Sequence, residues 1–139
     1  MKLSFYIHRT DASPENVYIY NSLNKLIDDG KVEDANVFFN DVSYNPVTPK
    51  FGIFDAANIW NYTGVLVCTT VQNLVKATKA VNKMKPVFLY DRNQKAHPYS
   101  LMGITQPVVV FNEEDSKEFY RLTGLEALLI EDFEQFRSF

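Results

Sequence analysis

The chain has 139 residues, of which 46% are hydrophobic and 22% charged, and these values exclude a disordered chain and describe one soluble globular domain. A formal net charge of −3 argues against general nucleic-acid binding, which normally requires a basic excess. The only cysteine, Cys68, excludes an internal disulfide, and two histidines leave little for a metal centre. No apolar run approaches the length of a membrane span or a signal peptide, so we expect a cytoplasmic protein with no membrane contact.

The first 50 residues predict a strand, a helix, a second strand and a loop. The apolar run Leu3–Ile7 predicts the first strand, and Ala35–Phe39 predicts the second. Ser13 followed by Pro14 is typical of a helix start, because serine caps the free N–H groups and proline suits the first helical position. The apolar face of this helix is formed by Val17, Tyr20, Leu23 and Ile27. Gly30 follows and is placed to end the helix. Residues 40–50, with two prolines, predict a loop.

Residues 51–92 predict a strand–helix–strand unit. A short helical turn is expected at Phe54–Trp60, and continuous apolar runs at Val65–Cys68 and Val87–Tyr90 predict two buried strands. The helix between them starts after Thr69 and Thr70, and its apolar residues recur with helical spacing: Val71, Leu74, Val75, Thr78 and Val81. Cys68 lies inside the first of these strands, so we expect a buried, unreactive thiol.

The last third of the chain predicts two more strands and two helices. Residues 93–103 are expected to be irregular, and Pro107–Phe111 predicts a strand. Asn112 caps a helix whose acidic first turn suits the helix dipole and which Gly124 ends. A last short strand is expected at Ala127–Ile130 and a terminal helix at residues 132–139.

Apolar strands that alternate with amphipathic helices are typical of a parallel sheet covered on both faces. We therefore predict an α/β fold for residues 1–139: a single-domain, Rossmann-like, three-layer α/β/α sandwich with a mainly parallel sheet of five to six strands.

Polar residues follow several of the predicted strands, at the edge where ligands of such sheets bind. We predict a cleft at this edge that is lined by His8, Arg9, Asp11, Thr69, Thr70, Asp91 and Arg92. Asp91 and Arg92 could equally form a local ion pair that closes the strand. No Gly-x-Gly-x-x-Gly or Walker pattern occurs, and the five glycines are scattered, so we expect no nucleotide cofactor, although Arg9 is a reasonable ligand for an anion.

The segment Phe54–Thr70, FDAANIWNYTGVLVCTT, followed by a helix and by Lys85–Asp91, KPVFLYD, resembles the N-terminal half of GT-B-type glycosyltransferases, especially small phage-encoded ones. In that family an Asp-x-x-x-x-Trp segment precedes a strand that ends in Thr or Ser, and an aromatic-rich strand ends in Asp. The later segments Pro107–Glu114 and Leu129–Phe133 fall where that domain has its last strand, helix and exit. The resemblance covers nearly the whole chain.

By this resemblance Asp91 is the candidate catalytic base, which would take a proton from an acceptor hydroxyl. Phage DNA glucosyltransferases have Asp-Ile-Arg at this position, whereas here Arg92 follows Asp91 directly. The chain ends where the second, donor-binding domain would begin, so the resemblance implies a domain that binds a ligand or partner without independent catalysis. One alternative is a glycosyltransferase that a partner chain or oligomer completes, with a nucleotide-sugar as donor and a hydroxyl as acceptor.

Phe133, Phe136 and Phe139 recur every third residue in the terminal helix. These rings either pack on their own sheet or form an exposed apolar stripe. In the second case we expect a homodimer through this stripe, and a dimeric interaction protein is therefore a further alternative.

Overall fold

The computed structural model describes residues 1–80, 83–94 and 96–139. In this part of the chain seven strands, all parallel, form one sheet with the order β3-β2-β1-β4-β5-β6-β7. The strands are β1 Lys2–Thr10, β2 Asp34–Val42, β3 Gly52–Asp55, β4 Gly64–Cys68, β5 Met84–Leu89, β6 Val108–Val110 and β7 Leu128–Leu129. The predicted α/β, Rossmann-like fold is confirmed, with seven strands in place of five to six.

The additional strand is β3, in a region where a helical turn was expected from residue 54. It is a four-residue edge strand with largely exposed side chains, so it lacks the continuous buried run that identifies the inner strands. The helical turn begins only after β3, as the 3₁₀ helix η1, Ala56–Asn61. Asp55 caps this helix, because its carboxylate accepts a hydrogen bond of 2.9 Å from the backbone N–H of Ala57.

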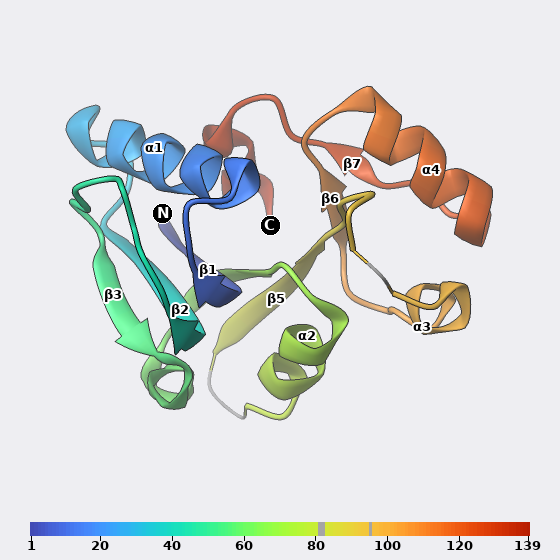
Figure 1. Ribbon diagram of the computed structural model, residues 1–139, viewed down its shortest axis with the longest axis horizontal. Helices are drawn as coiled ribbons and strands as arrows, with labels where there is room; N and C mark the ends of the chain where they lie inside the picture. The colour runs from blue at the N-terminus through green and yellow to red at the C-terminus, as the bar shows by residue number, and fades with distance from the viewer. Residues whose placement is uncertain (81–82, 95) are drawn as a thin grey trace.

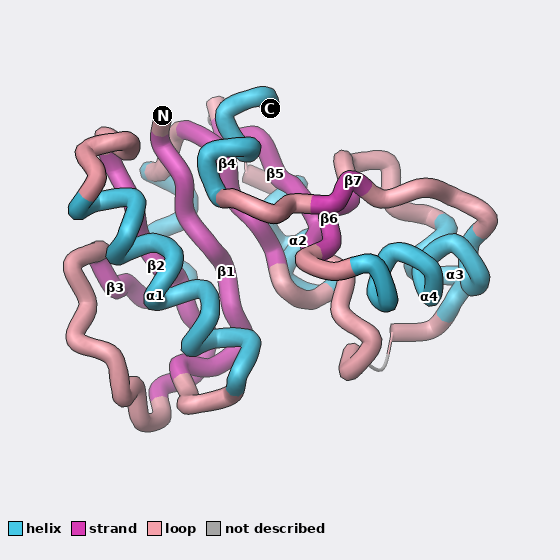
Figure 2. The backbone as a smooth tube through the Cα atoms, turned by 90° about the horizontal axis from the view of Figure 1, so that it is seen from above, coloured by secondary structure: helices cyan, strands magenta, loops and turns pink. Residues whose placement is uncertain are grey.

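Helices cover both faces of the sheet, which gives three layers (Figures 1 and 2). Helix α1, Pro14–Asp28, and the 3₁₀ helix η2, Phe133–Ser138, pack on one face. The other face carries η1 together with three α-helices: α2 Val71–Thr78, α3 Pro98–Met102 and α4 Glu113–Thr123. Val81, which was expected to be the last inward residue of the second helix, lies outside the described residues.

The segment that was predicted to be irregular contains α3. This helix has only five residues, and its N-cap is the ring of His97, whose Nδ1 accepts a hydrogen bond of 3.2 Å from the backbone N–H of Tyr99. Neither feature is a usual sequence signal of a helix start. The expected caps of the longer helices are confirmed at Ser13, Thr70 and Asn112, since each side chain accepts a hydrogen bond from the first turn.

The terminal aromatic rings belong to the hydrophobic core. Phe133 and Phe136 are 3% and 0% exposed, and their ring centroids lie 5.2 and 5.9 Å from that of Phe5 in β1. Phe139 is half-buried and packs against the same core. Of the two alternatives, packing on the chain's own sheet is confirmed and the exposed stripe is wrong, because η2 folds back over the sheet and supplies part of the layer on the α1 face. Dimerisation remains a prediction, without this surface to support it.

The order in which strands are added to the sheet reverses between β1 and β4: β2 and β3 lie on one side of β1, and the later strands lie on the other. Strand β1 pairs with β2 on one side and with β4 on the other, so the crossovers run outward in opposite directions from this point. All the strands end at the same edge, which carries the loops after β1, β4, β5 and β6. No helix within the described ranges is long and apolar enough to span a membrane.

Candidate functional site: two clefts along helix α1

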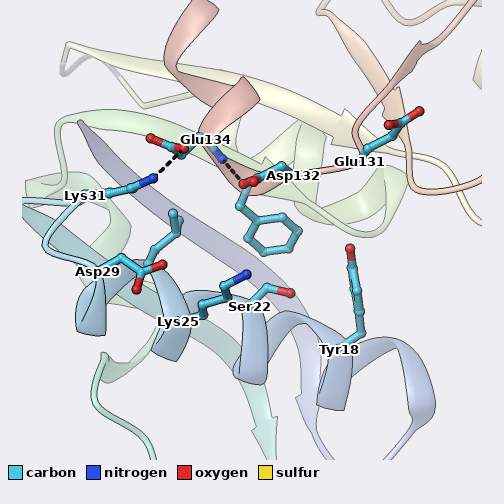
Figure 3. Close-up of a pocket in the computed structure, with 10 residues that line it drawn as sticks. Tyr18, Ser22, Lys25, Asp29, Lys31, Glu131, Asp132 and Glu134 are labelled. Carbon is cyan, nitrogen blue, oxygen red and sulfur yellow. Dashed lines mark hydrogen bonds and ion pairs between the residues drawn. The ribbon is translucent and has the colours of Figure 1, made fainter.

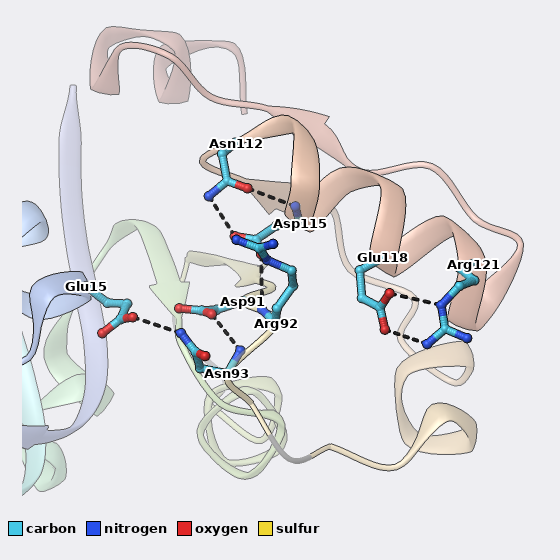
Figure 4. Close-up of polar contacts among 8 residues, drawn as sticks. All are labelled: Glu15, Asp91, Arg92, Asn93, Asn112, Asp115, Glu118 and Arg121. Atoms are coloured by element: carbon cyan, nitrogen blue, oxygen red, sulfur yellow. Dashed lines mark hydrogen bonds and ion pairs between the residues drawn. The ribbon is translucent and has the colours of Figure 1, made fainter.

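Two clefts lie along one face of α1. This face presents side chains at helical spacing: Glu15, Tyr18, Ser22, Lys25 and, just after the helix, Asp29. The cleft at the C-terminal half, with a volume of about 300 Å³, lies against the segment Glu131–Glu134 and reaches Lys31 (Figure 3); we call it the Lys31 cleft. The cleft at the N-terminal half, of about 360 Å³, we call the Asp91 cleft (Figure 4).

The Asp91 cleft is built at the carboxyl ends of β5 and β6, where parallel sheets bind ligands. The loop after β5 supplies Asp91, Arg92 and Asn93, the loop after β6 supplies Phe111 and Asn112, and α4 supplies Asp115. The first turns of α1 form the opposite wall with Pro14, Glu15 and Tyr18. The cleft therefore combines carboxylates, amides and one guanidinium with three aromatic residues, Tyr18, Tyr90 and Phe111.

Arg92 is held in place by Asp115 of helix α4 (Figure 4). One carboxylate oxygen of Asp115, Oδ1, accepts hydrogen bonds of 2.8 Å from Nε of Arg92 and 3.2 Å from its backbone N–H. The other, Oδ2, accepts one of 3.0 Å from Nδ2 of Asn112. The Asp115 side chain is 8% exposed and that of Arg92 52% exposed, so the carboxylate is an internal anchor while the guanidinium reaches solvent.

Asp91 has a raised pKa. The main cause is partial burial, which disfavours the charged form, and the negative charges of Asp115 and Glu15 add to it. The backbone N–H of Asn93, which donates a hydrogen bond of 2.8 Å to Oδ1 of Asp91, and the charge of Arg92 oppose this shift only in part. A carboxyl group whose pKa is moved toward neutrality inside a cleft is suited to proton transfer.

The loop that carries Asp91 is also tied to α1. The side-chain amide of Asn93 donates a hydrogen bond of 3.1 Å to the carboxylate of Glu15, which closes this end of the cleft. The loop after β5 thus bridges the first turns of α1 and α4, so its conformation is set by contacts with two helices.

The loop after β1 has a structural role at the start of α1. The carboxylate of Asp11 accepts hydrogen bonds of 3.1 Å from the backbone N–H of Ser13 and 2.7 Å from Nδ2 of Asn16. Burial by itself would raise the pKa of Asp11, but these hydrogen bonds and the charge of Arg9 outweigh it, so the pKa is lowered. The Arg9 side chain is exposed, and its carbonyl accepts a hydrogen bond from the same Asn16 amide.

A separate polar network lies where β1, β2 and β4 end. Its centre is Asn40, whose side chain bridges the hydroxyl of Tyr6 at 2.6 Å and Oδ1 of Asn73 at 2.8 Å. His8 lies at the margin of this network, 3.4 Å from Asn40 and with Nε2 3.6 Å from the carboxylate of Asp41. Thr69 donates a hydrogen bond to the carbonyl of Tyr6, and Thr70 caps α2.

The predicted site residues therefore do not form one cleft. Of the set, Asp91 and Arg92 line the Asp91 cleft, whereas the remaining members serve the α1 cap, the α2 cap and the Asn40 network: His8, Arg9, Asp11, Thr69 and Thr70. The Asp91–Arg92 alternative was a local ion pair, but the carboxylate that pairs with Arg92 is Asp115.

Sequence reasoning missed several residues that line the cleft: Glu15, Tyr18, Asn93, Asn112 and Asp115. It also missed that Asp115 is the ion-pair partner of Arg92. Asp115 was interpreted only as a helix-dipole residue, and Glu15 lies in the first turn of α1. Both α1 and α4 start at the ligand-binding edge of the sheet. An acid in the first turn of such a helix is a signal that could have indicated Glu15 and Asp115.

Neither a cluster of metal ligands nor a reactive thiol occurs among the residues that the structure describes. Among the residues that the structure describes, no group of three or more His, Cys, Asp or Glu side chains is arranged to hold a metal ion. Cys68 is fully buried, and this burial raises the pKa of its thiol far above the usual range, as expected for an unreactive cysteine.

Together, the fold and the clefts define an α/β protein with a parallel, Rossmann-ordered sheet and a polar, aromatic-lined site at the carboxyl ends of its strands. Comparison of the chain with models of known families, with curated proteins and with solved structures finds no match.

Proposed function

We propose that this protein binds a hydroxyl-rich ligand of the sugar-acceptor type in the Asp91 cleft, and that the isolated chain transfers no sugar. The observation that supports the proposal best is the Asp91 carboxylate itself, which has a raised pKa and lies at a strand end in a cleft of about 360 Å³. This is also the residue that the resemblance to GT-B glycosyltransferases marks as the base.

The chemistry of the cleft suits a polyol. Carboxylate oxygens accept hydrogen bonds from hydroxyl groups, and the amides of Asn93 and Asn112 both donate and accept. The rings of Tyr18 and Phe111, with centroids 5.1 Å apart, offer an apolar surface for the C–H face of a sugar ring. Within the described residues, Oδ2 of Asp91 has no hydrogen-bond partner, so it is available to a ligand hydroxyl.

The cleft supplies one half of a transfer reaction. Asp91 would accept the proton of a hydroxyl as that oxygen attacks a sugar carbon. In GT-B enzymes the donor is held by a second domain, and bringing the two reactants together provides a large part of the rate. The part of the chain that the structure describes contains one sheet with one set of strand-end loops, so we expect binding by this chain without turnover. Catalysis completed by a partner chain is the second candidate, and the same Asp91 favours it.

Calorimetric titration tests the proposal. Glucose, N-acetylglucosamine and UDP-glucose are titrated into the wild-type chain, into Asp91→Asn and into the control Glu114→Gln. The control removes one charge from an exposed residue that does not line the cleft. We expect weak binding of at least one sugar to the wild type and to the control, and a loss of about tenfold or more in Asp91→Asn, which removes a charged hydrogen-bond acceptor.

The absence of binding by every sugar, or equal binding by Asp91→Asn and the wild type, would contradict the proposal. Release of UDP from UDP-glucose by the pure chain in the presence of an acceptor sugar would instead favour the enzyme alternative, provided that Asp91→Asn abolishes it.

A further inference from the structure

We infer that the two clefts along α1 form one continuous groove for a linear, amine-bearing oligosaccharide, with the Asp91 cleft at one end. This inference rests on the proposed function and extends it, because it assigns the Lys31 cleft as a second part of the binding site and states the length and the charge of the ligand.

Continuity follows from Tyr18, which lines both clefts. Its ring packs edge-on against Phe111 in the Asp91 cleft, at 5.1 Å, and against Phe133 in the Lys31 cleft, at 5.7 Å. Tyr18 is 42% exposed, so one edge of the ring faces solvent between the two clefts. Among the described residues its hydroxyl makes no hydrogen bond, and Figure 3 shows that it points toward the segment Glu131–Asp132.

The length of the groove follows from α1. The stripe that lines it runs from Glu15 to Asp29, which spans about 21 Å at the helical rise of about 1.5 Å per residue. Two contacts bridge its walls: the Asn93–Glu15 hydrogen bond of 3.1 Å at one end and the Lys31–Glu134 ion pair of 2.9 Å at the other (Figures 3 and 4). A site of this length exceeds the size of one sugar ring and fits a short linear chain.

The groove combines exposed aromatic surface with free polar groups. In the Lys31 cleft the side chains of Ser22 and Lys25 make no hydrogen bond to another described residue, so both can donate to a ligand. Phe133 also lines this cleft, but its ring is only 3% exposed, so the exposed aromatic surface is that of Tyr18. Rings flanked by hydroxyl, ammonium and carboxylate groups suit a ligand that offers C–H surface and hydroxyls in alternation.

The charge of the groove selects the charge of the ligand. The Lys31 cleft has four carboxylates and two lysines: Asp29, Glu131, Asp132, Glu134, Lys25 and Lys31. The Asp91 cleft adds three carboxylates and one guanidinium: Glu15, Asp91, Asp115 and Arg92. Seven acids against three cations give a formal charge of −4, whereas the whole chain carries −3. This potential attracts amine-bearing ligands and repels polyanions such as DNA.

Calorimetric titration with sugar oligomers tests the inference. Glucosamine and its tetramer are titrated into the wild type, Asp91→Asn and the double variant Asp29→Asn/Glu131→Gln. The latter neutralises two exposed acids of the Lys31 cleft whose carboxylates accept no hydrogen bond from another described residue. The matched control Glu114→Gln/Glu126→Gln makes the same charge change on exposed residues that line neither cleft.

We expect the tetramer to bind at least tenfold more tightly than the monomer, and the Asp29/Glu131 variant to lose roughly three- to fivefold for the tetramer only, as exposed charge pairs give. The control should behave as the wild type. At equal length, the affinity should fall from the glucosamine tetramer to the N-acetylglucosamine tetramer and then to the galacturonic acid tetramer.

A tetramer that binds no better than the monomer, or tetramer binding unaffected by the Asp29/Glu131 substitutions, would overturn the continuous groove. A preference for the anionic tetramer would overturn the assigned ligand charge. If either result is found while glucosamine binding still depends on Asp91, the groove is wrong and the proposed function stands. If the wild type does not bind the monomer, the proposed function itself fails.

Discussion

Removal of the Asp115 carboxylate is expected to destabilise the fold and to lower the pKa of Asp91. In Asp115→Ala the backbone N–H of Arg92 loses its acceptor, which costs about 1 kcal/mol, the lower end of the range for an unpaired donor, because this group is only partly buried. The Arg92–Asp115 ion pair adds only about 0.2–1 kcal/mol, since the Arg92 side chain is 52% exposed. Loss of an acid from the first turn of α4 adds about 0.3–1 kcal/mol.

These contributions predict a loss of about 1.5–3 kcal/mol in the free energy of unfolding, which a domain with a stability of about 5–15 kcal/mol survives. Urea unfolding measures the loss, and NMR titration of the Asp91 side-chain carboxyl measures its pKa. The Asp91 pKa should fall because the charge of Asp115 contributes to raising it. Glu113→Ala, an exposed first-turn acid, is the control and should cost about 0.5 kcal/mol.

A loss below about 1 kcal/mol in Asp115→Ala, or a loss equal to that of the control, would refute the anchoring role of Asp115. An Asp91 pKa that stays constant or rises would refute the electrostatic coupling between the two carboxyl groups.

Three further predictions follow from burial. Phe136→Ala should lower the free energy of unfolding by about 3–5 kcal/mol in urea, whereas Tyr120→Ala, at a 57% exposed ring, should stay within about 0.5 kcal/mol; near-equal values would contradict the core position of Phe136. Asp91→Asn should increase stability at neutral pH, because the raised pKa means that ionising Asp91 disfavours the folded state. The gain in the free energy of unfolding should disappear as the pH falls through the raised pKa toward 3.8. Urea midpoints that show a constant gain between pH 7 and 3 would contradict this. Cys68 should react with a thiol reagent such as DTNB only at the rate of unfolding, because its side chain is buried. Rapid labelling of the folded chain would show that the thiol is accessible to solvent.

The sequence by itself determined the fold class and most of the elements, because these depend on short-range patterns. Apolar runs such as Val65–Cys68 can be satisfied only by burial on both faces of a sheet. Caps at Ser13, Thr70 and Asn112 bond to N–H groups three residues away, so they are readable from neighbouring positions. The placement of Asp91 at a strand end followed from the same local pattern.

The tertiary structure alone decided which side chains meet. Arg92 and Asp115 are 23 residues apart in the chain, and Asn93 and Glu15 are 78 apart, so no local pattern joins them. The rings of Phe133 and Phe136 show the same limit: their spacing is compatible with a core or a surface position, and they are buried because η2 returns to Phe5 of the first strand. Periodicity determines which face of an element is apolar, whereas the packing of elements distant in sequence determines what that face contacts and which polar groups share a cleft.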